Sequence, residues 1–382
     1  MKPTIGDQIL KGTVRDLHLF PAEIYVDHEK TGRSGHMSHA MTEFRPGKII
    51  DFNSNCSGKR LGGHAAYGWI EYRISEDYGK TFGPARKLPY AWECFIDGLK
   101  TISVEKAVSL PDGTIAAFLL RNSQSSVICC EPWDTPYITL SHDGGNTWEE
   151  PFEISPYRGR IYDAVIHDGK VYFLEFCNDA SVHFCGNRPD HLYRIYVSED
   201  GCRSFHELAV VPFPTTFGRA YGNFSVTPEG SLIVYAYNMN AQDQMDYIIS
   251  KDWGISWEAP GTCYVAKCIR NPQVGILDGQ YILHGRAGEY SDERGEFVFY
   301  TSADGIHWDE GKILVSGKPC CFYSNNLTVR CPDGKDRLLV QYSENYGYER
   351  NDPYQGDHFF PNDWSEKFNC RVNVMHLWIE SV

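Results

Sequence analysis

The chain has 382 residues, a formal net charge of −14 at pH 7, and no apolar run long enough to span a membrane. The negative charge argues against nucleic acid or an anionic membrane as the main partner, and the lack of a long apolar run argues against a membrane-spanning helix. Aromatic residues make up 14% of the chain, alongside 35 glycines and 20 prolines. That composition suits many short strands joined by tight turns.

Six hairpins are predicted along the chain, each made of two apolar, β-rich runs around a tight turn that contains glycine. In chain order the turns are Pro46-Gly47, Pro111–Gly113, Asp168-Gly169, Pro228–Gly230, Asp278-Gly279 and Pro332–Gly334. No long run keeps a helical period. We therefore expect almost no helix.

Five Ser-x-Asp turns, each leading to an aromatic residue, alternate with these hairpins. They are Ser75–Phe82, Ser141–Trp148, Ser198–Phe205, Ser250–Trp257 and Ser302–Trp308. In each turn the aspartate can fold back on backbone N–H groups, glycine supplies a positive φ, and the final ring packs between units. The serines recur every 52 to 66 residues, a period typical of repeat architectures.

These turns resemble the Asp-box of sialidase-type β-propellers, and the resemblance covers most of the chain. Six hairpins and five boxes predict an all-β fold, a six-bladed β-propeller of four-stranded antiparallel blades, with seven blades as the alternative. We expect residues 1–382 to form one domain. The sixth blade lacks a box, so its outer strand is expected from Thr13–Leu19 or Glu23–Val26. The long insertion 346–369 is expected to form a lid.

The first residues of the chain are polar, and its 13 cysteines include no Cys-x-x-Cys pair. Cysteines in odd number, without zinc-ligand spacing, indicate buried reduced thiols. We therefore expect a cytoplasmic protein with no metal site and no cofactor, and a loop-bound calcium stays open. The sequence carries no signal for the oligomeric state.

Polar residues gather where the inner strand of each predicted blade begins and where the second strand ends. Both ends lie on one face of a propeller, so the side chains converge on one funnel. The candidate catalytic residues are His36, His39, Tyr162 and Tyr342. The candidate substrate-binding residues are Asn53, Lys106, Arg160, Arg219, Asn223, Arg270, Gln273, Arg286 and Asn325. Guanidinium groups bind carboxylates in pairs, and amides and phenols reach hydroxyls, so the set favours an acidic oligosaccharide.

Sialidases place three arginines on the substrate carboxylate and use a Tyr–Glu nucleophile pair with an aspartate. The resemblance puts the first arginine on the opening inner strand, where this chain has Gly35–Ala40 without arginine. Arg45 lies next to the glycine turn, at the wrong end of that strand. Arg219, Arg270 or Arg286 could fill the other two places, with Tyr342 or Tyr323 as the phenol. A sialidase-like retaining exo-glycosidase is therefore kept as an alternative.

The opening segment Gly35–Lys48 is similar to that of propeller enzymes that act on rhamnosyl–glucuronate ends of plant gums. Those enzymes, a rhamnosidase group and a lyase group, rely on a histidine at about this place. The resemblance implies an enzyme that cleaves a terminal glycosidic bond of a uronate-containing oligosaccharide by His-assisted lyase or hydrolase chemistry. A histidine suits this task because it exchanges protons near neutral pH. A non-catalytic glycan-binding propeller is the other alternative.

Overall fold

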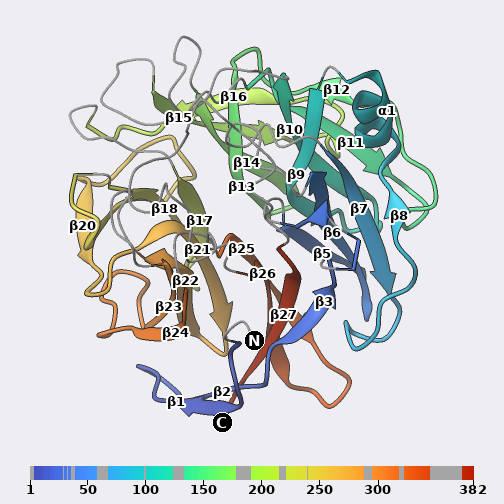
Figure 1. Ribbon diagram of the computed structural model, residues 1–382. Coiled ribbons are helices and arrows are strands. Elements are labelled where there is room, and N and C mark those ends of the chain that lie inside the picture. The colour runs from blue at the N-terminus through green and yellow to red at the C-terminus, as the bar shows by residue number, and fades with distance from the viewer. Residues whose placement is uncertain are drawn as a thin grey trace, which may run out of the picture.

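The computed structural model describes residues 4–28, 30–31, 33–35, 39–57, 68–98, 100–123, 133–177, 191–214, 221–238, 240–287, 295–317, 322–344 and 372–382. Within these residues the strands form six antiparallel sheets, which stand around a common centre (Figure 1). The sheets are the six predicted blades. The lid expected over 346–369 lies outside the described residues.

The first three blades each run from a long inner strand to a shorter outer strand. Blade one contains β5 (His39–Arg45), β6 (Lys48–Ser57), β7 (Gly68–Ser75) and β8 (Arg86–Lys87), and β4 (Arg33–Ser34) also pairs with β6. Blade two contains β9 (Lys100–Ser109), β10 (Ile115–Ser123), β11 (Tyr137–Ser141) and β12 (Phe152–Glu153). Blade three contains β13 (Gly159–His167), β14 (Lys170–Cys177), β15 (Leu192–Ser198) and β16 (His206–Val210).

The other three blades follow the same order. Blade four contains β17 (Gly222–Val226), β18 (Leu232–Tyr237), β19 (Gln244–Ser250) and β20 (Gly261–Tyr264). Blade five contains β21 (Arg270–Leu277), β22 (Gln280–Ala287), β23 (Gly295–Ser302) and β24 (Lys312–Gly317). Blade six contains β25 (Ser324–Arg330), β26 (Asp336–Ser343), β27 (Val374–Ser381), β2 (Leu17–Leu19) and β1 (Gln8–Leu10), and β3 (Glu23–Val26) also pairs with β27.

The two ends of the chain close the ring together. Both N-terminal segments expected to complete blade six pair with β27, because β2 and β3 each lie antiparallel to it. The inner strands contact one another in circular order, from β5 through β9, β13, β17 and β21 to β25 and back to β5. This arrangement brings the starts of all six inner strands to one end of the central channel.

The boxes lie on the opposite face from these starts. In blades one to five the third strand ends at the serine that opens a box. The first and third strands of an antiparallel sheet run in the same direction. The boxes therefore share a face with the hairpin turns, and the inner strands begin at the other face.

The second box shows how the turn is held. The Ser141 hydroxyl accepts a hydrogen bond from the Gly145 N–H at 2.8 Å. One Asp143 carboxylate oxygen accepts from the N–H groups of Asn146 and Thr147, both at 2.9 Å, and the other accepts from the Thr147 hydroxyl at 2.7 Å. These donors, the Thr147 N–H first, lower the pKa of Asp143 to about 2. The box is thus a turn closed by its own aspartate.

The aromatic residue that ends each box packs against the preceding blade, as Trp148 illustrates. Its ring lies 5.8 Å from Phe52 and 5.6 Å from Tyr72, edge to face, and both partners belong to blade one. We expect Trp148→Ala to lower the free energy of unfolding by about 3 kcal/mol, the low end for a tryptophan because this ring is only partly buried. Urea unfolding measures it.

The matched control for this prediction is Tyr264→Ala, which truncates a ring that is 63% exposed on the outer strand β20. A surface change of this kind is expected to cost about 0.5 kcal/mol or less. Equal losses in the two variants would contradict the view that the box ring binds neighbouring blades together.

One short helix departs from the all-strand pattern. The helix α1 (Pro89–Asp97) follows β8, with proline in its first turn and Gly98 in a left-handed conformation at its end (φ 68°). Both residues are typical of those positions. In the described part of the chain, no helix is long and apolar enough to cross a membrane.

Candidate functional site

A small pocket, with a cavity volume of about 30 Å³, lies where the inner strands begin. It brings together six of the predicted site residues, His39, Lys106, Arg160, Tyr162, Gln273 and Asn325, with Glu105, Asn271, Tyr323 and Ser324. These side chains come from β5, β9, β13, β21, β25 and the residue before β25. Two further predicted residues, His36 and Arg219, lie outside the described residues.

Three inner strands carry a β-bulge at the level of this pocket. The pairing of β9 with β10 passes over Glu105, that of β13 with β14 passes over Tyr162, and that of β21 with β22 passes over Asn271 and Pro272. Glu105, Tyr162 and Asn271 all line the pocket. A bulge re-aims a side chain that strict alternation would point elsewhere. The bulges therefore explain how adjacent or nearby residues of one strand reach the same cavity.

An arginine–carboxylate pair forms one wall of the pocket. Nη2 and Nε of Arg160 both donate to Oε2 of Glu105, at 2.7 and 3.0 Å. Both side chains are less than 10% exposed. The second oxygen of Glu105, Oε1, is buried and has no hydrogen-bond partner among the described residues. It is therefore able to accept a hydrogen bond from a bound molecule.

The Lys106 ammonium group ties four blades together at the pocket floor. It lies 3.1 Å from Oδ1 of Asp163 in blade three and donates to Oε1 of Gln273 in blade five at 2.9 Å. It also donates to Oδ1 of Asn325 in blade six at 2.8 Å. All three hydrogen positions of the ammonium group are thus directed to protein oxygens. Lys106 therefore has a structural role at the floor.

Three guanidinium groups gather around the ring of Tyr221, next to the pocket. The central carbons of Arg160, Arg270 and Arg286 lie 5.9, 5.7 and 5.9 Å from the ring centroid. Arg286 donates to the Tyr221 hydroxyl at 3.3 Å and lies 4.9 Å from the ring of Tyr323. Arg270 and Arg286 face each other across β21 and β22. The structure thus brings the three described arginines of the predicted site to one place.

His39 begins β5 and is 5% exposed. Its Nδ1 lies 3.0 Å from Oε1 of Gln341, and its backbone carbonyl accepts from the Asn325 amide at 2.6 Å. Burial lowers the pKa of His39 from 6.5 to about 3. The imidazole is therefore neutral at physiological pH, and its burial makes it a weaker base than an exposed histidine.

Two predicted binding residues, Asn53 and Asn223, hold neighbouring strands together and do not line the pocket. The carbonyl oxygen of the Asn53 amide accepts from Arg73 at 2.7 Å. The Asn223 amide donates to Oδ2 of Asp163 at 2.6 Å and accepts from the Val274 N–H at 3.1 Å, which links blades three, four and five. Both side chains therefore form hydrogen bonds to neighbouring strands.

Tyr342 also lies away from the pocket, which corrects its expected place there. Its ring stacks on Phe297 at 5.0 Å and lies 6.4 Å from Phe322, inside an apolar cluster. Burial raises the pKa of Tyr342, so the phenol keeps its proton. Tyr162 and Tyr323 are the phenols that line the pocket.

Three buried histidines predict a loss of stability in acid. Burial lowers the pKa of His39 and His284 to about 3 and that of His28 to about 4, from 6.5. Below pH 6.5 the unfolded chain binds protons that the folded chain does not. The stabilisation is therefore complete above pH 6.5 and is lost as the pH falls toward 3 or 4, by up to roughly 1.4 kcal/mol per pH unit for each histidine.

We accordingly expect the free energy of unfolding to fall steeply between pH 6.5 and 5, measured by urea unfolding at each pH. His284→Gln removes one of the three groups, so the slope is expected to become shallower by up to roughly 1.4 kcal/mol per pH unit. The control His206→Gln changes an exposed histidine and is expected to leave the slope unchanged. A wild-type stability that does not change over this range would contradict the burial of neutral histidines.

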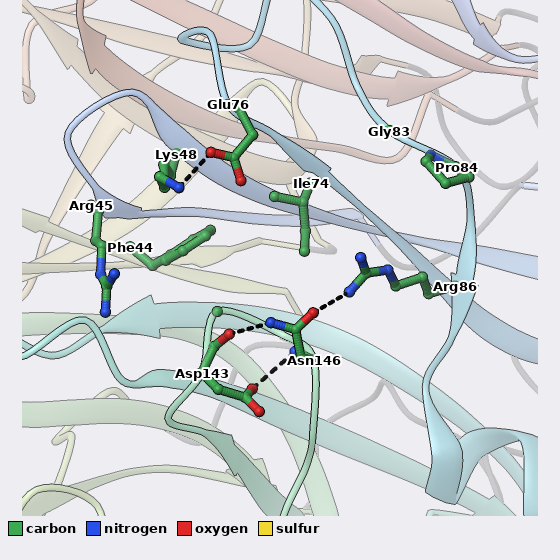
Figure 2. Close-up of a pocket in the computed structure, with 11 residues that line it drawn as sticks. Phe44, Arg45, Lys48, Ile74, Glu76, Gly83, Pro84, Arg86, Asp143 and Asn146 are labelled. Atoms are coloured by element: carbon green, nitrogen blue, oxygen red, sulfur yellow. Dashed lines mark hydrogen bonds and ion pairs between the residues drawn. The ribbon is translucent and has the colours of Figure 1, made fainter.

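A second pocket lies on the opposite face, between the first hairpin turn and the second box. Figure 2 shows Lys48 paired with Glu76 at 2.5 Å and Arg86 donating to Asn146 at 2.9 Å. Arg45, which sequence analysis assigned to the wrong end of the inner strand, lines this pocket, along with Phe44, Ile74, Gly83, Pro84, Asp143 and Gly144. Asp143 belongs to the box turn, and Lys48 and Arg86 are paired. The pocket at the inner-strand starts instead gathers polar side chains from five of the six inner strands, and we take it as the candidate functional site.

Metal ligands do not gather in the described parts of the chain. No group of three or more histidine, cysteine, aspartate or glutamate side chains is placed to hold a metal ion there. Glu105, which lines the pocket, accepts from Arg160. Asp163 is paired with Lys106 and accepts from Asn223.

No family model and no curated protein matches the chain. Among solved structures, a protein of unknown function from Dyadobacter fermentans is 14% identical, with a TM-score of 0.68 over 96% of this chain and 99% of that chain. A Hadza microbial sialidase is 15% identical, with a TM-score of 0.62 over 84% of this chain and 66% of that one. A mutant of the NanB sialidase from Streptococcus pneumoniae is 10% identical, with a TM-score of 0.59 over 91% and 68%. At such identities the likeness shows the fold alone, and the chain has a β-propeller fold similar to that of these sialidases.

Proposed function

We propose that this protein is an enzyme that cleaves a glycosidic bond at a terminal, carboxylate-bearing sugar of an acidic oligosaccharide. The observation that supports the proposal most is the convergence of three guanidinium groups on Tyr221, beside a pocket that contains His39. The sialidase-like fold agrees with a role of this kind.

The arginines favour a carboxylate as the group to be recognised. Guanidinium groups stay charged at every physiological pH, so bringing Arg160, Arg270 and Arg286 together costs coulombic energy. Glu105 offsets part of this cost at Arg160, and a bound anion would offset more. A planar carboxylate matches the fork of an arginine, which donates two parallel hydrogen bonds. The amide of Asn271 lines the pocket beside them and suits a sugar hydroxyl. A uronate or another acidic sugar presents both kinds of group.

His39 is the proposed base. In an elimination, its Nε2 takes the C5 proton of a uronate, the C5–H electron pair forms a C4=C5 double bond, and the C4–O bond breaks. The departing oxygen takes a proton, for which Tyr162 is the proposed donor. Arginine pairing with the carboxylate makes the C5 proton acidic enough to be removed. In a hydrolysis, the same His39 nitrogen instead takes a proton from the attacking water.

A sialidase-like mechanism is the second candidate, because Tyr323 lines the pocket and its ring lies 4.9 Å from the Arg286 guanidinium. A phenol beside an arginine cluster is the arrangement that the resemblance to sialidases implies for the nucleophile. In that case Glu105 is the only carboxylate among the described residues that line the pocket.

Incubation with glucuronate-ended oligosaccharides and with a fluorogenic sialoside tests these candidates. An ultraviolet absorbance band from the conjugated C4=C5 bond would show elimination, and new reducing ends without that band would show hydrolysis. Turnover of the sialoside would favour the Tyr323 mechanism. Tight binding across a panel of acidic glycans without any turnover would overturn the proposed activity and leave a glycan-binding propeller.

A further inference from the structure

A chain of four buried polar side chains runs behind the pocket, where blade six meets blade one. Oδ2 of Asp51 lies 3.0 Å from Nε2 of His376, and Oδ1 of Asp51 lies 2.5 Å from Nε2 of Gln341. Oε1 of Gln341 lies 3.0 Å from Nδ1 of His39. Asp51 and Gln341 are completely buried, and His39 and His376 are 5% and 7% exposed. The chain thus connects the inside of the protein to the pocket.

The chemistry of these groups fixes every hydrogen along the chain. A carboxylate only accepts hydrogen bonds, so Asp51 orients the Gln341 side chain with its NH₂ group toward the carboxylate. The carbonyl oxygen of Gln341 then faces His39, and this oxygen also only accepts. Nδ1 of His39 must therefore carry the hydrogen, since the network assigns the tautomer.

The other ring nitrogen of His39 is left with a lone pair. Nε2 is buried and has no hydrogen-bond partner among the described residues, and His39 lines the pocket. We infer that Asp51 and Gln341 are positioning residues that hold His39 in the Nδ1–H tautomer, with Nε2 ready to accept a proton. The role in turnover rests on the proposed function, and the tautomer itself does not.

The inference separates two roles that sequence analysis left open for this histidine. A neutral imidazole with its hydrogen on Nδ1 has no proton to give from Nε2. His39 therefore enters the reaction as the base, and the proton for the leaving group has to come from another side chain. The arrangement also gives a reason for the burial of Asp51, which is held in hydrogen bonds to an amide and an imidazole.

The experiment is nitrogen-15 NMR of histidine-labelled protein at pH 7.5, with the His39 signals assigned by their loss in His39→Gln. The expected result is a protonated Nδ1 and an unprotonated Nε2. In Asp51→Asn the new amide can donate toward Gln341, so the Gln341 side chain can turn and the Nε2–H tautomer of His39 is expected to appear. Gln341→Met, which removes the acceptor, is expected to release the tautomer as well.

His284 serves as the internal control in the same spectra. Its Nδ1 lies 2.8 Å from the Ser324 hydroxyl and its Nε2 accepts from the Asn326 amide at 2.9 Å, so its tautomer is expected to stay the same in both variants. On a substrate that the wild type turns over, Asp51→Asn is expected to lower kcat by roughly 10²-fold, the scale of a general base, with KM nearly unchanged.

Three outcomes would overturn the inference. They are a wild-type His39 that carries its hydrogen on Nε2, a doubly protonated His39 at pH 7.5, and a tautomer that neither variant changes. The wild-type spectrum decides the first two, even if a variant does not fold. If only the proposed function is wrong, the spectra still show the Nδ1–H tautomer of His39, and no acidic oligosaccharide is cleaved.

Discussion

Arg286→Met is expected to lower kcat/KM on an acidic oligosaccharide by about 10²–10³-fold. The Arg286 side chain is 5% exposed, touches both Tyr221 and Tyr323, and faces Arg270 across two paired strands. Loss of one partner of a desolvated arginine–carboxylate pair costs about 2–5 kcal/mol, and each 1.4 kcal/mol is a factor of ten. Methionine keeps the length of the side chain without its charge.

Two comparisons make this result specific to carboxylate recognition. Arg194→Met changes an arginine away from the pocket, which lies 2.7 Å from Glu207 and over the ring of Tyr157. This variant is expected to leave kcat/KM within about threefold. The ratio of activity on the acid to activity on its carboxamide analogue is expected to fall with Arg286→Met. An unchanged ratio would show that Arg286 does not bind the carboxylate. Thermal melts of both variants separate this effect from unfolding.

The fold could be predicted from turn chemistry because each signal has a local cause. Aspartates such as Asp143 close the box turn with their own carboxylate, and the box serines end the third strands. Each hairpin turn needs a left-handed residue, which Gly47 and Gly113 supply at φ 76° and 88°. One detail was not visible in the pattern, since Tyr78, Cys202 and Trp253 also take positive φ values inside boxes.

The site could be predicted only in part because both faces of a propeller blade are buried. Tyr342 and Gln341 are neighbours on β26, yet Tyr342 packs on Phe297 of blade five and Gln341 contacts Asp51 of blade one. Alternation of polar and apolar residues assigns a face only when one face meets water. The pattern of residues therefore predicted Tyr342 at the pocket and gave no sign of Gln341.

The other site residues could not be predicted because their positions depend on β-bulges and on contacts between buried polar side chains. The extra residues Glu105 and Tyr162 reach the pocket because the strand pairing skips them, and no residue type marks a bulge in the sequence. A signal did exist for the positioning residues. Asp51 stands between Ile50 and Phe52 in a strand that is otherwise apolar at this point, and a charged side chain in such a run needs a buried partner.

Lys106→Met is expected to lower the free energy of unfolding by about 3–5 kcal/mol. The Lys106 and Asp163 side chains are 11% and 8% exposed, and the ammonium lies 3.1 Å from the carboxylate. Removal of the cation leaves a buried carboxylate without its counter-ion, and it leaves Oε1 of Gln273 without a donor. Urea unfolding at pH 7.5 gives the loss. Lys170→Met, which removes the cation of the exposed pair with Glu199, is expected to cost about 1 kcal/mol or less.

The double variant of Lys106→Met and Asp163→Asn tests whether the loss of stability comes from the charge of Lys106. Asp163→Asn keeps the shape of the side chain and removes its charge, so its combination with Lys106→Met leaves no buried carboxylate unpaired. The double variant is therefore expected to be more stable than Lys106→Met alone, with a coupling energy of about 1–3 kcal/mol between the two positions. Additive losses would mean that Lys106 stabilises the floor through its hydrogen bonds to Gln273 and Asn325 and not through its pairing with Asp163. In that case the ion pair would contribute little to holding blades two and three together, and the ring would depend on its apolar contacts.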